Sequence, residues 1–316
     1  MNSSSKGVDT LLLCGDKGAS RSVYGVSKSF IYMHGKPLFA HVLDALFKTQ
    51  NVRRIFIIGN KQKLDANISQ LGRQRDFPKP VITIEQDSNL IANIWSGFLA
   101  TLGANHQSER QVNKELIDKV ILVLPGDVPL ISAAEVDDFL LKADIGCYDY
   151  VMGMTPSNEM AIFHSTGKKP GIKMASAYFR EGSFRINNLH LARPFACKNL
   201  DAVQLLYNSR YQKNVMNMLR LTRDMWRQHI KVQSLFLYFL MQVSSLLAYL
   251  GLEKFNWVAR RYVPMTKVAA AVGRILGMRA GFVITTAGGA ALDVDNEADY
   301  ETMKLRFLEW KGTQQF

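Results

Sequence analysis

The chain has 316 residues, 47% of them apolar and 21% charged, so it is long enough to bury a large core and is not a disordered chain. Its cysteines number three and are widely spaced, which excludes a disulfide framework and indicates a reducing compartment. The net charge is +12. Because the polar first ten residues lack the pattern of a signal peptide, we expect a cytoplasmic protein.

The positive charge is concentrated in the middle of the sequence. Residues 165–280 hold 19 Lys and Arg against 4 Asp and Glu, a balance of +15, and the remaining residues hold 20 against 23, a balance of −3. A segment with this much positive charge attracts phosphate-rich partners: an anionic membrane surface, a phosphorylated substrate or nucleic acid.

The first half of the chain alternates strand-like and helix-like patterns. Short runs typical of strands occupy 11–14, 54–59, 81–85 and 119–124, and helical spacing of apolar residues occupies 38–49 and 91–102. This alternation predicts βαβ units and a mostly parallel sheet covered on both faces. Ligands of such sheets bind beyond the carboxyl ends of the strands.

From residue 165 the pattern changes. A basic helical stretch at 199–230, an uncharged run at 232–252 and a basic amphipathic stretch at 262–278 precede a strand at 281–286 and a final helix. We therefore predict that 1–164 and 281–316 form one α/β core and that 165–280 is a basic, mostly helical insertion.

A glycine-rich loop follows the first strand. Glycines let backbone N–H groups approach phosphate oxygens, and Lys and Arg supply charge where a leaving pyrophosphate develops it. The alternative is an ordinary turn with solvated charges. The candidate residues are Gly15, Asp16, Lys17, Gly18, Arg21 and Lys28.

Carboxylates occur in two further loops. Asp127 follows the run at 119–124 within Pro-Gly-Asp, where it either holds Mg²⁺ or caps the helix that begins near Ser132. Asp293 and Asp295 alternate along an extended segment and so share a face, whereas Asp299 falls in the first turn of the last helix and suits a cap better than a metal site.

Together these segments resemble the nucleotidyltransferase superfamily of molybdenum-cofactor guanylyltransferase-like NTP transferases and sugar-phosphate nucleotidyltransferases. The resemblance covers residues 10–160 and 281–305 and implies a three-layer, Rossmann-like fold of the GT-A type. It rests on the opening loop with its Gly-Lys-Pro-Leu, on Gly126-Asp127-Val128-Pro129 and on the late Asp-x-Asp-x-x-x-Asp.

The resemblance also implies roles for single residues. Gly15 and Gly18 would wrap the phosphates, Lys28 would neutralise the α-phosphate, and Asp127 with Asp295, assisted by Asp293, would hold Mg²⁺. Gln86 would face the base, with Asn93 bracing the nucleoside; the alternative for Gln86 is an exposed loop residue. Asp16 and Arg21 depart from the family pattern, and their roles stay open. The nucleotide expected is CTP or GTP.

The acceptor is expected to bind at 165–191, where relatives bind theirs. The anion and amide donors there suit a phosphorylated small-molecule or lipid-linked acceptor, and a solvated basic loop is the alternative. The candidates are Lys173, Arg180, Arg185, Asn187 and Asn188.

The run at 232–252 is long enough to cross a bilayer, but a single crossing would separate Asp127 from Asp295, which must meet at one metal. Three interpretations are left: a buried helix, a dimer-forming helix, or a helix lying on the inner face of the membrane.

The sequence thus predicts an enzyme, a Mg²⁺-dependent nucleotidyltransferase that moves NMP from an NTP to a phosphorylated acceptor. Two alternatives are a nucleotide-sugar glycosyltransferase and an inactive scaffold that binds membrane or nucleic acid through its basic segment. Nucleic acid is disfavoured because the charges are not interleaved with stacking aromatic residues.

Overall fold

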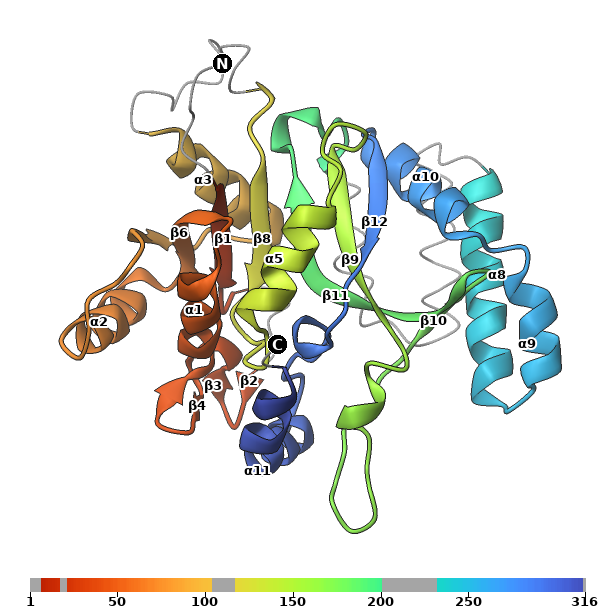
Figure 1. Ribbon diagram of the computed structural model, residues 1–316. Helices are drawn as coiled ribbons and strands as arrows, with labels where there is room; N and C mark the ends of the chain where they lie inside the picture. The colour runs from red at the N-terminus through yellow and green to blue at the C-terminus, as the bar shows by residue number, and fades with distance from the viewer. Residues whose placement is uncertain (1–6, 18–21, 104–116, 201–231, 315–316) are drawn as a thin grey trace.

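The computed structural model describes residues 7–17, 22–103, 117–200 and 232–314 (Figure 1). Gly18, Arg21 and most of the helical stretch expected at 199–230 lie outside the described residues. An eight-stranded sheet forms the centre, in the order β12-β9-β11-β8-β1-β6-β7 with β10 paired to β11. Its strands are β1 (Val8–Cys14), β6 (Val52–Gly59), β7 (Val81–Glu85), β8 (Ile121–Pro125), β9 (Tyr150–Pro156), β10 (Ala177–Phe179), β11 (Gly182–Ala192) and β12 (Ala280–Ile284).

The sheet is mostly parallel. β1 runs parallel to β6 and β8, β6 to β7 and β9 to β12, whereas β11 runs antiparallel to its neighbours β8, β9 and β10. Two small hairpins, β2 (Ser22–Val23) with β3 (Val26–Ser27) and β4 (Tyr32–Met33) with β5 (Lys36–Pro37), follow β1. The carboxyl ends of β1 and β8 therefore lie at one edge, which is the lower edge in Figure 1.

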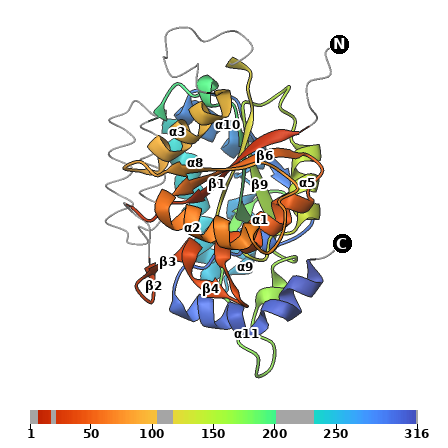
Figure 2. The same cartoon turned by 90° about the vertical axis from the view of Figure 1, so that its left-hand side faces the viewer.

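Helices cover both faces of the sheet because side chains alternate along its strands. Leu12 and Cys14 of β1 pack in a core with α1 (Leu38–Lys48) and α5 (Ala133–Lys142), whereas Leu11 packs on the other face with α3 (Leu90–Leu102). This arrangement confirms the predicted three-layer α/β fold. Figure 2 shows the layers from the side.

Four helices begin at a residue whose side chain accepts a backbone N–H three positions on. These residues are Asn60 before α2 (Lys61–Gly72), Asn89 before α3, Ser132 before α5 and Asn296 before α11 (Glu297–Thr313). Such caps satisfy an otherwise unpaired helical donor and fix where each helix leaves its loop. Because Ser132 caps α5, Asp127 is not the cap of that helix.

The segment 165–280 differs from the helical stretch expected from the sequence. It contains β10 and β11, and β11 lies between β8 and β9 in the middle of the sheet. The reason is visible in the alternation of its second half: Asn187, Leu189 and Leu191 are buried, and the less buried Asn188 and His190 separate them. A period of two of this kind is typical of a strand, whatever the basic charge of the segment around it.

The helices of this segment follow later in the chain. They are α8 (Val232–Tyr249), α9 (Glu253–Arg260) and α10 (Met265–Leu276). α10 packs Met265 and Val268 against Phe179 and Phe184 of the β10–β11 hairpin, in a core that Leu240 of α8 also contacts. Among the described helices, none combines the length and the apolar character needed to cross a bilayer.

Candidate active site

Three loops that are far apart in the sequence lie side by side at the carboxyl ends of β1 and β8. The amide of Gly126 donates to the carbonyl of Leu13 at 2.8 Å, and the amide of Val294 donates to the carbonyl of Asp127 at 3.1 Å. A Cβ on Gly126 would lie 2.6 Å from Cys14 Sγ, so only glycine fits this close approach. These contacts place the Pro-Gly-Asp loop between the first loop and the late aspartates.

The centre of this arrangement is Lys28, held by a short 3-10 helix, η1 (Lys28–Phe30), whose Phe30 packs on Phe39. Lys28 Nζ lies 2.8 Å from Asp295 Oδ1 and 3.8 Å from Asp127 Oδ2. The lysine side chain is only 7% exposed. A buried ammonium costs desolvation, which the two carboxylates offset. The three residues are called the lysine–aspartate cluster below.

Negative charge exceeds positive charge around this cluster. Burial, and next the neighbouring Asp295, raise the pKa of Asp293, although Arg185 Nη2 lies 3.2 Å from Asp293 Oδ1. Burial, followed by Asp295 and Asp293, also raises the pKa of Asp299. Asp299 occupies the first turn of α11, as expected, where its amide donates to the capping side chain of Asn296. The excess of carboxylates makes the edge attractive to a cation.

A divalent cation fits these donors in chemistry and in charge. Within the described ranges, no group of three or more His, Cys, Asp or Glu side chains is arranged to hold a metal. Magnesium usually keeps several waters and needs only one or two protein carboxylates. Asp127 and Asp295 already face one cation, the Lys28 ammonium, so a pair of carboxylates suited to Mg²⁺ is present.

The first loop is described only in part, and within it Asp16 is held by contacts with Gln86 and Lys63. Its amide donates to Gln86 Oε1 at 2.8 Å, its carboxylate accepts from Gln86 Nε2, and Lys63 Nζ lies 3.5 Å from Asp16 Oδ2. Lys17 is exposed. The sequence does not predict the contact of Asp16 with Lys63, because Lys63 follows Asp16 by 47 residues and belongs to an ordinary solvated helix, α2. The charge of the Asp16 carboxylate is therefore compensated by Lys63 and by the amide of Gln86.

Gln86 and Asn93 hold the first loop in place. Both are buried, and a Cβ on Gly15 would lie 3.2 Å from a polar atom of each. Asn93 Oδ1 accepts from the amide of Asp87 at 2.6 Å. The side-chain amide of Gln86 contacts Asp16 through both its oxygen and its nitrogen in this structure, so reading a base would use its second N–H or require that pair to open.

The residues expected at the acceptor do not gather into one group. Lys173 is exposed, and Arg180 pairs with Glu181 at 3.1 Å. Asn187 is buried and bonded to Thr155 and Thr285, so it stabilises the sheet and is closed to a ligand.

Two neighbouring residues of β11 do reach the candidate site. Asn188 Nδ2 donates to the carbonyl of Ala290 at 2.9 Å, and Arg185 Nε donates to the carbonyl of Ala291 at 2.6 Å. These carbonyls belong to the 3-10 helix η5 (Gly289–Ala291), directly before Asp293. Arg185 thus links the expected acceptor segment to the late aspartates.

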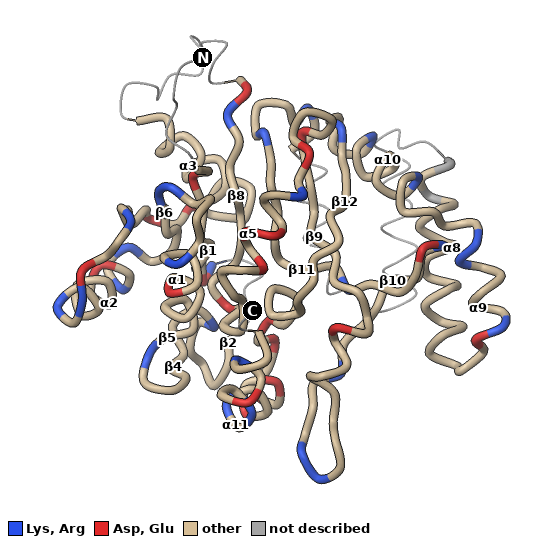
Figure 3. Tube along the Cα trace, viewed as in Figure 1, with Lys and Arg blue, Asp and Glu red and all other residues tan. Residues whose placement is uncertain are grey.

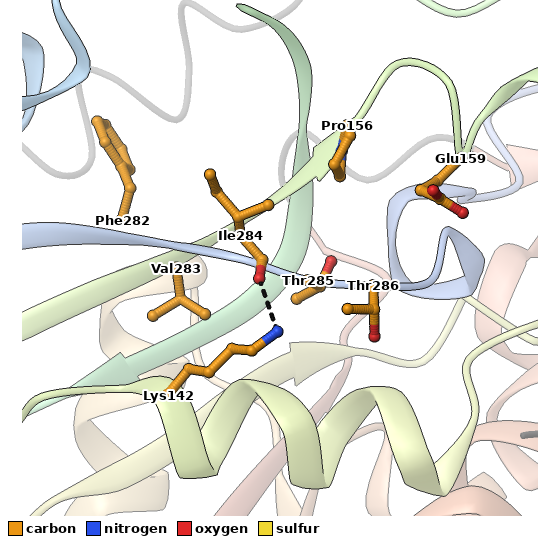
Figure 4. Close-up of a pocket in the computed structure, with 8 residues that line it drawn as sticks. All are labelled: Lys142, Pro156, Glu159, Phe282, Val283, Ile284, Thr285 and Thr286. Carbon is orange, nitrogen blue, oxygen red and sulfur yellow. Dashed lines mark hydrogen bonds between the residues drawn. The ribbon is translucent and has the colours of Figure 1, made fainter. Parts of the chain in front are cut away.

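A cavity of about 590 Å³ lies beside the edge strand β12. Figure 4 shows Lys142 of α5 donating to the carbonyl of Ile284, with Thr285, Thr286 and Glu159 nearby. The lining includes no member of the lysine–aspartate cluster, and β12 is four strands from β1 in the sheet. This cavity is therefore separate from the candidate active site.

Comparison with known proteins bears on the family and the fold. The family model of the MobA-like NTP transferase domain matches residues 10–184, more than half of the chain. No curated protein matches the chain. A solved structure of a hypothetical transferase from Thermus thermophilus is 22% identical, with a TM-score of 0.61, over 93% of this chain and 99% of its own, and it has the same fold.

Two other solved structures are more distant. CMP:2-keto-3-deoxy-manno-octonic acid synthetase in complex with CTP is 13% identical, with a TM-score of 0.45, over 96% of this chain and 99% of its own. The 4-diphosphocytidyl-2C-methyl-D-erythritol synthase from Anaerococcus prevotii is 12% identical, with a TM-score of 0.40, over 70% of this chain and 82% of its own.

Proposed function

Because this chain belongs to the MobA-like NTP transferase domain family, and so is a nucleotidyltransferase, we propose that it transfers NMP from an NTP to a phosphorylated acceptor in the presence of Mg²⁺. The observation that carries the proposal is the lysine–aspartate cluster. Its lysine and its two carboxylates come from three separate loops, and they meet at the edge of the sheet where ligands of such folds bind.

In this proposal the chain positions groups and compensates charge. Asp127 and Asp295 would hold Mg²⁺, which when bound supplies neutralising charge to the triphosphate. Lys28 would then leave the carboxylates and approach the α-phosphate, and the amides of the first loop, beginning at Gly15, would bind the leaving phosphates.

The reaction needs no covalent bond to the protein. An oxygen of the acceptor phosphate attacks the α-phosphorus, a new P–O–P linkage forms, and the bond between the α-phosphorus and its bridging oxygen breaks to release pyrophosphate. The attacking phosphate is already anionic, so the step requires no general base. Lys28 stabilises the charge that develops on the α-phosphoryl oxygens.

Several finer assignments belong to the proposal. The nucleotide is CTP or GTP, the acceptor is a phosphorylated small molecule or a lipid-linked phosphate, and the enzyme acts in the cytoplasm. Arg185 and Asn188 support an acceptor near Asp293, since both reach η5 from β11. Light scattering of the full chain in solution measures whether it forms a homodimer.

A pyrophosphate-release screen tests the proposal. The four NTPs are offered with phosphorylated sugars, polyols and lipid head groups, with Mg²⁺ or with EDTA. One combination should release pyrophosphate in the wild type, and Asp127→Asn and Asp295→Asn should each reduce the rate by about a hundredfold or more. Asp65→Asn is the matched control, because Asp65 is an exposed carboxylate that pairs with Lys61 at 2.6 Å outside the site. Equal rates in Asp295→Asn and Asp65→Asn would refute the proposed role of the cluster.

A further inference from the structure

Helices α8 and α9 form a hairpin whose turn and outer face carry large exposed apolar side chains. Trp257 is 54% exposed, Phe255 64% and Tyr249 87%. Soluble proteins rarely expose so many neighbouring apolar side chains unless the patch binds a partner, a ligand or a membrane. The set is called the apolar tip and consists of Tyr249, Leu250, Leu252, Phe255, Trp257 and Val258.

The outward direction of these side chains is fixed by a polar contact between the two helices. Ser244 of α8 and Asn256 of α9 are both buried, and Ser244 Oγ donates to Asn256 Oδ1 at 2.5 Å. In a helix on a soluble protein the apolar face normally turns inward. Here α9 turns an asparagine inward and leaves Phe255, Trp257 and Val258 exposed, so the residues that the structure describes leave its apolar face largely uncovered.

Cationic side chains surround the apolar tip. Lys254, Arg260 and Arg261 belong to or adjoin α9, against one acidic residue, Glu253. The guanidinium of Arg261 lies over the ring of Trp257 at 5.6 Å from its centroid. Figure 3 shows the basic positions on α9 and α10, with the acidic position at the start of α9.

A hollow between α9 and the β10–β11 hairpin adds a place for a polar group. It has a volume of about 700 Å³, and Lys254, Arg260, Trp257, Tyr178 and Ser183 are among its lining residues. Hydroxyl groups and cations beside an aromatic ring suit an anionic head group held at the boundary between apolar and aqueous surroundings.

We propose that the apolar tip docks on an anionic lipid bilayer, and that the acceptor is therefore a lipid-linked phosphate. Aromatic and leucine side chains enter the boundary of the acyl chains while Lys and Arg meet the anionic head groups. A second copy of the chain fits less well, because a symmetric contact would bring the cations of two tips together. A nucleic acid could stack on the aromatic side chains of the tip but would leave Leu250, Leu252 and Val258 without a partner, whereas acyl chains cover aromatic and aliphatic side chains alike.

The position of the tip relative to the site supports the assignment of the acceptor, which rests on the proposed function. The turn between α8 and α9 lies at the same end of the molecule as the carboxyl ends of β1 and β8, at the lower edge in Figure 1. Ser183 of the hollow and Arg185 are two residues apart on β11 and so share a face of the strand. Arg185 contacts Asp293, so the strand that lines the hollow also reaches the late aspartates beside the lysine–aspartate cluster.

Flotation of the full chain with vesicles tests the docking. Vesicles of phosphatidylcholine alone are compared with vesicles of equal parts phosphatidylcholine and phosphatidylglycerol. The wild type should bind the anionic vesicles, and the triple variant Leu250→Ser/Phe255→Ser/Trp257→Ser should bind them about tenfold less or weaker still. The matched control is Leu141→Ser/Leu305→Ser/Leu308→Ser, which removes three apolar side chains of α5 and α11 that are even more exposed than the three replaced in the tip, and it should bind as the wild type does.

Each result decides the proposal. Far-UV circular dichroism first establishes that both triple variants are folded. Equal vesicle binding by the two variants, or equal binding of the wild type to neutral and anionic vesicles, overturns the docking. A change from dimer to monomer in the tip variant, seen by light scattering without a loss of vesicle binding, shows instead that the tip is a contact between two copies.

Membrane docking and catalysis can be separated. Asp295→Asn should bind vesicles as the wild type does and lose pyrophosphate release. Vesicle binding without pyrophosphate release from any acceptor would retain the docking and refute the proposed function. Release with soluble phosphorylated acceptors and none with lipid-linked ones would refute the assignment of the acceptor alone.

Discussion

Replacing Lys28 by methionine separates two roles that one ammonium plays at the candidate site. In the structure this ammonium lies between Asp295 at 2.8 Å and Asp127 at 3.8 Å. With an effective dielectric constant of 20, the two attractions are about 6 and about 4 kcal/mol before desolvation. Desolvation of the buried lysine and solvent around the 35%-exposed Asp295 offset most of this, so we expect Lys28→Met to lower the free energy of unfolding by about 1–3 kcal/mol without Mg²⁺.

The same substitution should favour Mg²⁺. In the wild type the ion has to displace the ammonium from both carboxylates, whereas in Lys28→Met the carboxylates are not occupied by it. A difference of about 1.4 kcal/mol corresponds to an apparent Kd about tenfold tighter. Bound Mg²⁺ should then restore the thermal stability of Lys28→Met while pyrophosphate release stays low, by about a hundredfold or more.

Differential scanning fluorimetry across a Mg²⁺ titration, with isothermal calorimetry for the affinity, measures this effect. Lys61→Met is the control, since Lys61 also pairs with an aspartate but at an exposed helix position. An unchanged Mg²⁺ affinity in Lys28→Met would refute the reasoning, because it would mean that the ammonium and the metal do not share Asp127 and Asp295.

Three further outcomes are expected. Asp9 is buried with Arg53, Arg54 and Lys119, whose bonds hold the pKa of its carboxyl well below the usual range. Asp9→Asn should lower the free energy of unfolding in urea by about 2–4 kcal/mol at neutral pH. This contribution to stability should disappear only as the pH is lowered below about 4. Burial raises the pKa of Glu135 to about 8, so between about pH 4.5 and 8 the folded state retains a proton that the unfolded state has lost. The free energy of unfolding should decrease over that range by up to about 5 kcal/mol, and Glu135→Gln should show a flatter profile in unfolding measured at several pH values. Arg185→Met should lower kcat by about tenfold or more, because it removes the contacts of Arg185 with Asp293 and with the carbonyl of Ala291, and the circular dichroism spectrum should not change. An unaltered kcat would show that Arg185 does not position the aspartates.

The parts of the site that follow strands could be predicted from the sequence. The runs before Gly15 and Asp127 have the length and the apolar composition of buried strands, and the carboxyl ends of neighbouring parallel strands share an edge. The motif resemblance connected these loops to Asp295, and the 2.8 Å contact with Lys28 brings both ends of that pattern together.

The parts that depend on pairing between distant side chains could not be predicted. The contacts of Asp16 with Gln86 and Lys63 arise from the packing of β7 and α2 beside β1, and no local pattern encodes them. The place of β11 was also hidden, because an antiparallel strand between two parallel ones is set by tertiary contacts. By contrast, helical spacing within 253–260 alone indicates the outward aromatic face of α9, although the uncharged run before it obscures this signal.

The pairing of Lys28 with Asp295 spans 267 residues of chain, and the amide of Val294 donates to the carbonyl of Asp127, which lies 167 residues earlier. Contacts of such high sequence separation carry a large loop-closure cost and form late in folding. The sheet can therefore assemble before the site does, and a chain whose last helix has not yet docked has Lys28 and Asp127 but lacks the second carboxylate. Activity then reports completed folding, and a nucleotide that binds the assembled cluster should favour closure of the whole chain by mass action.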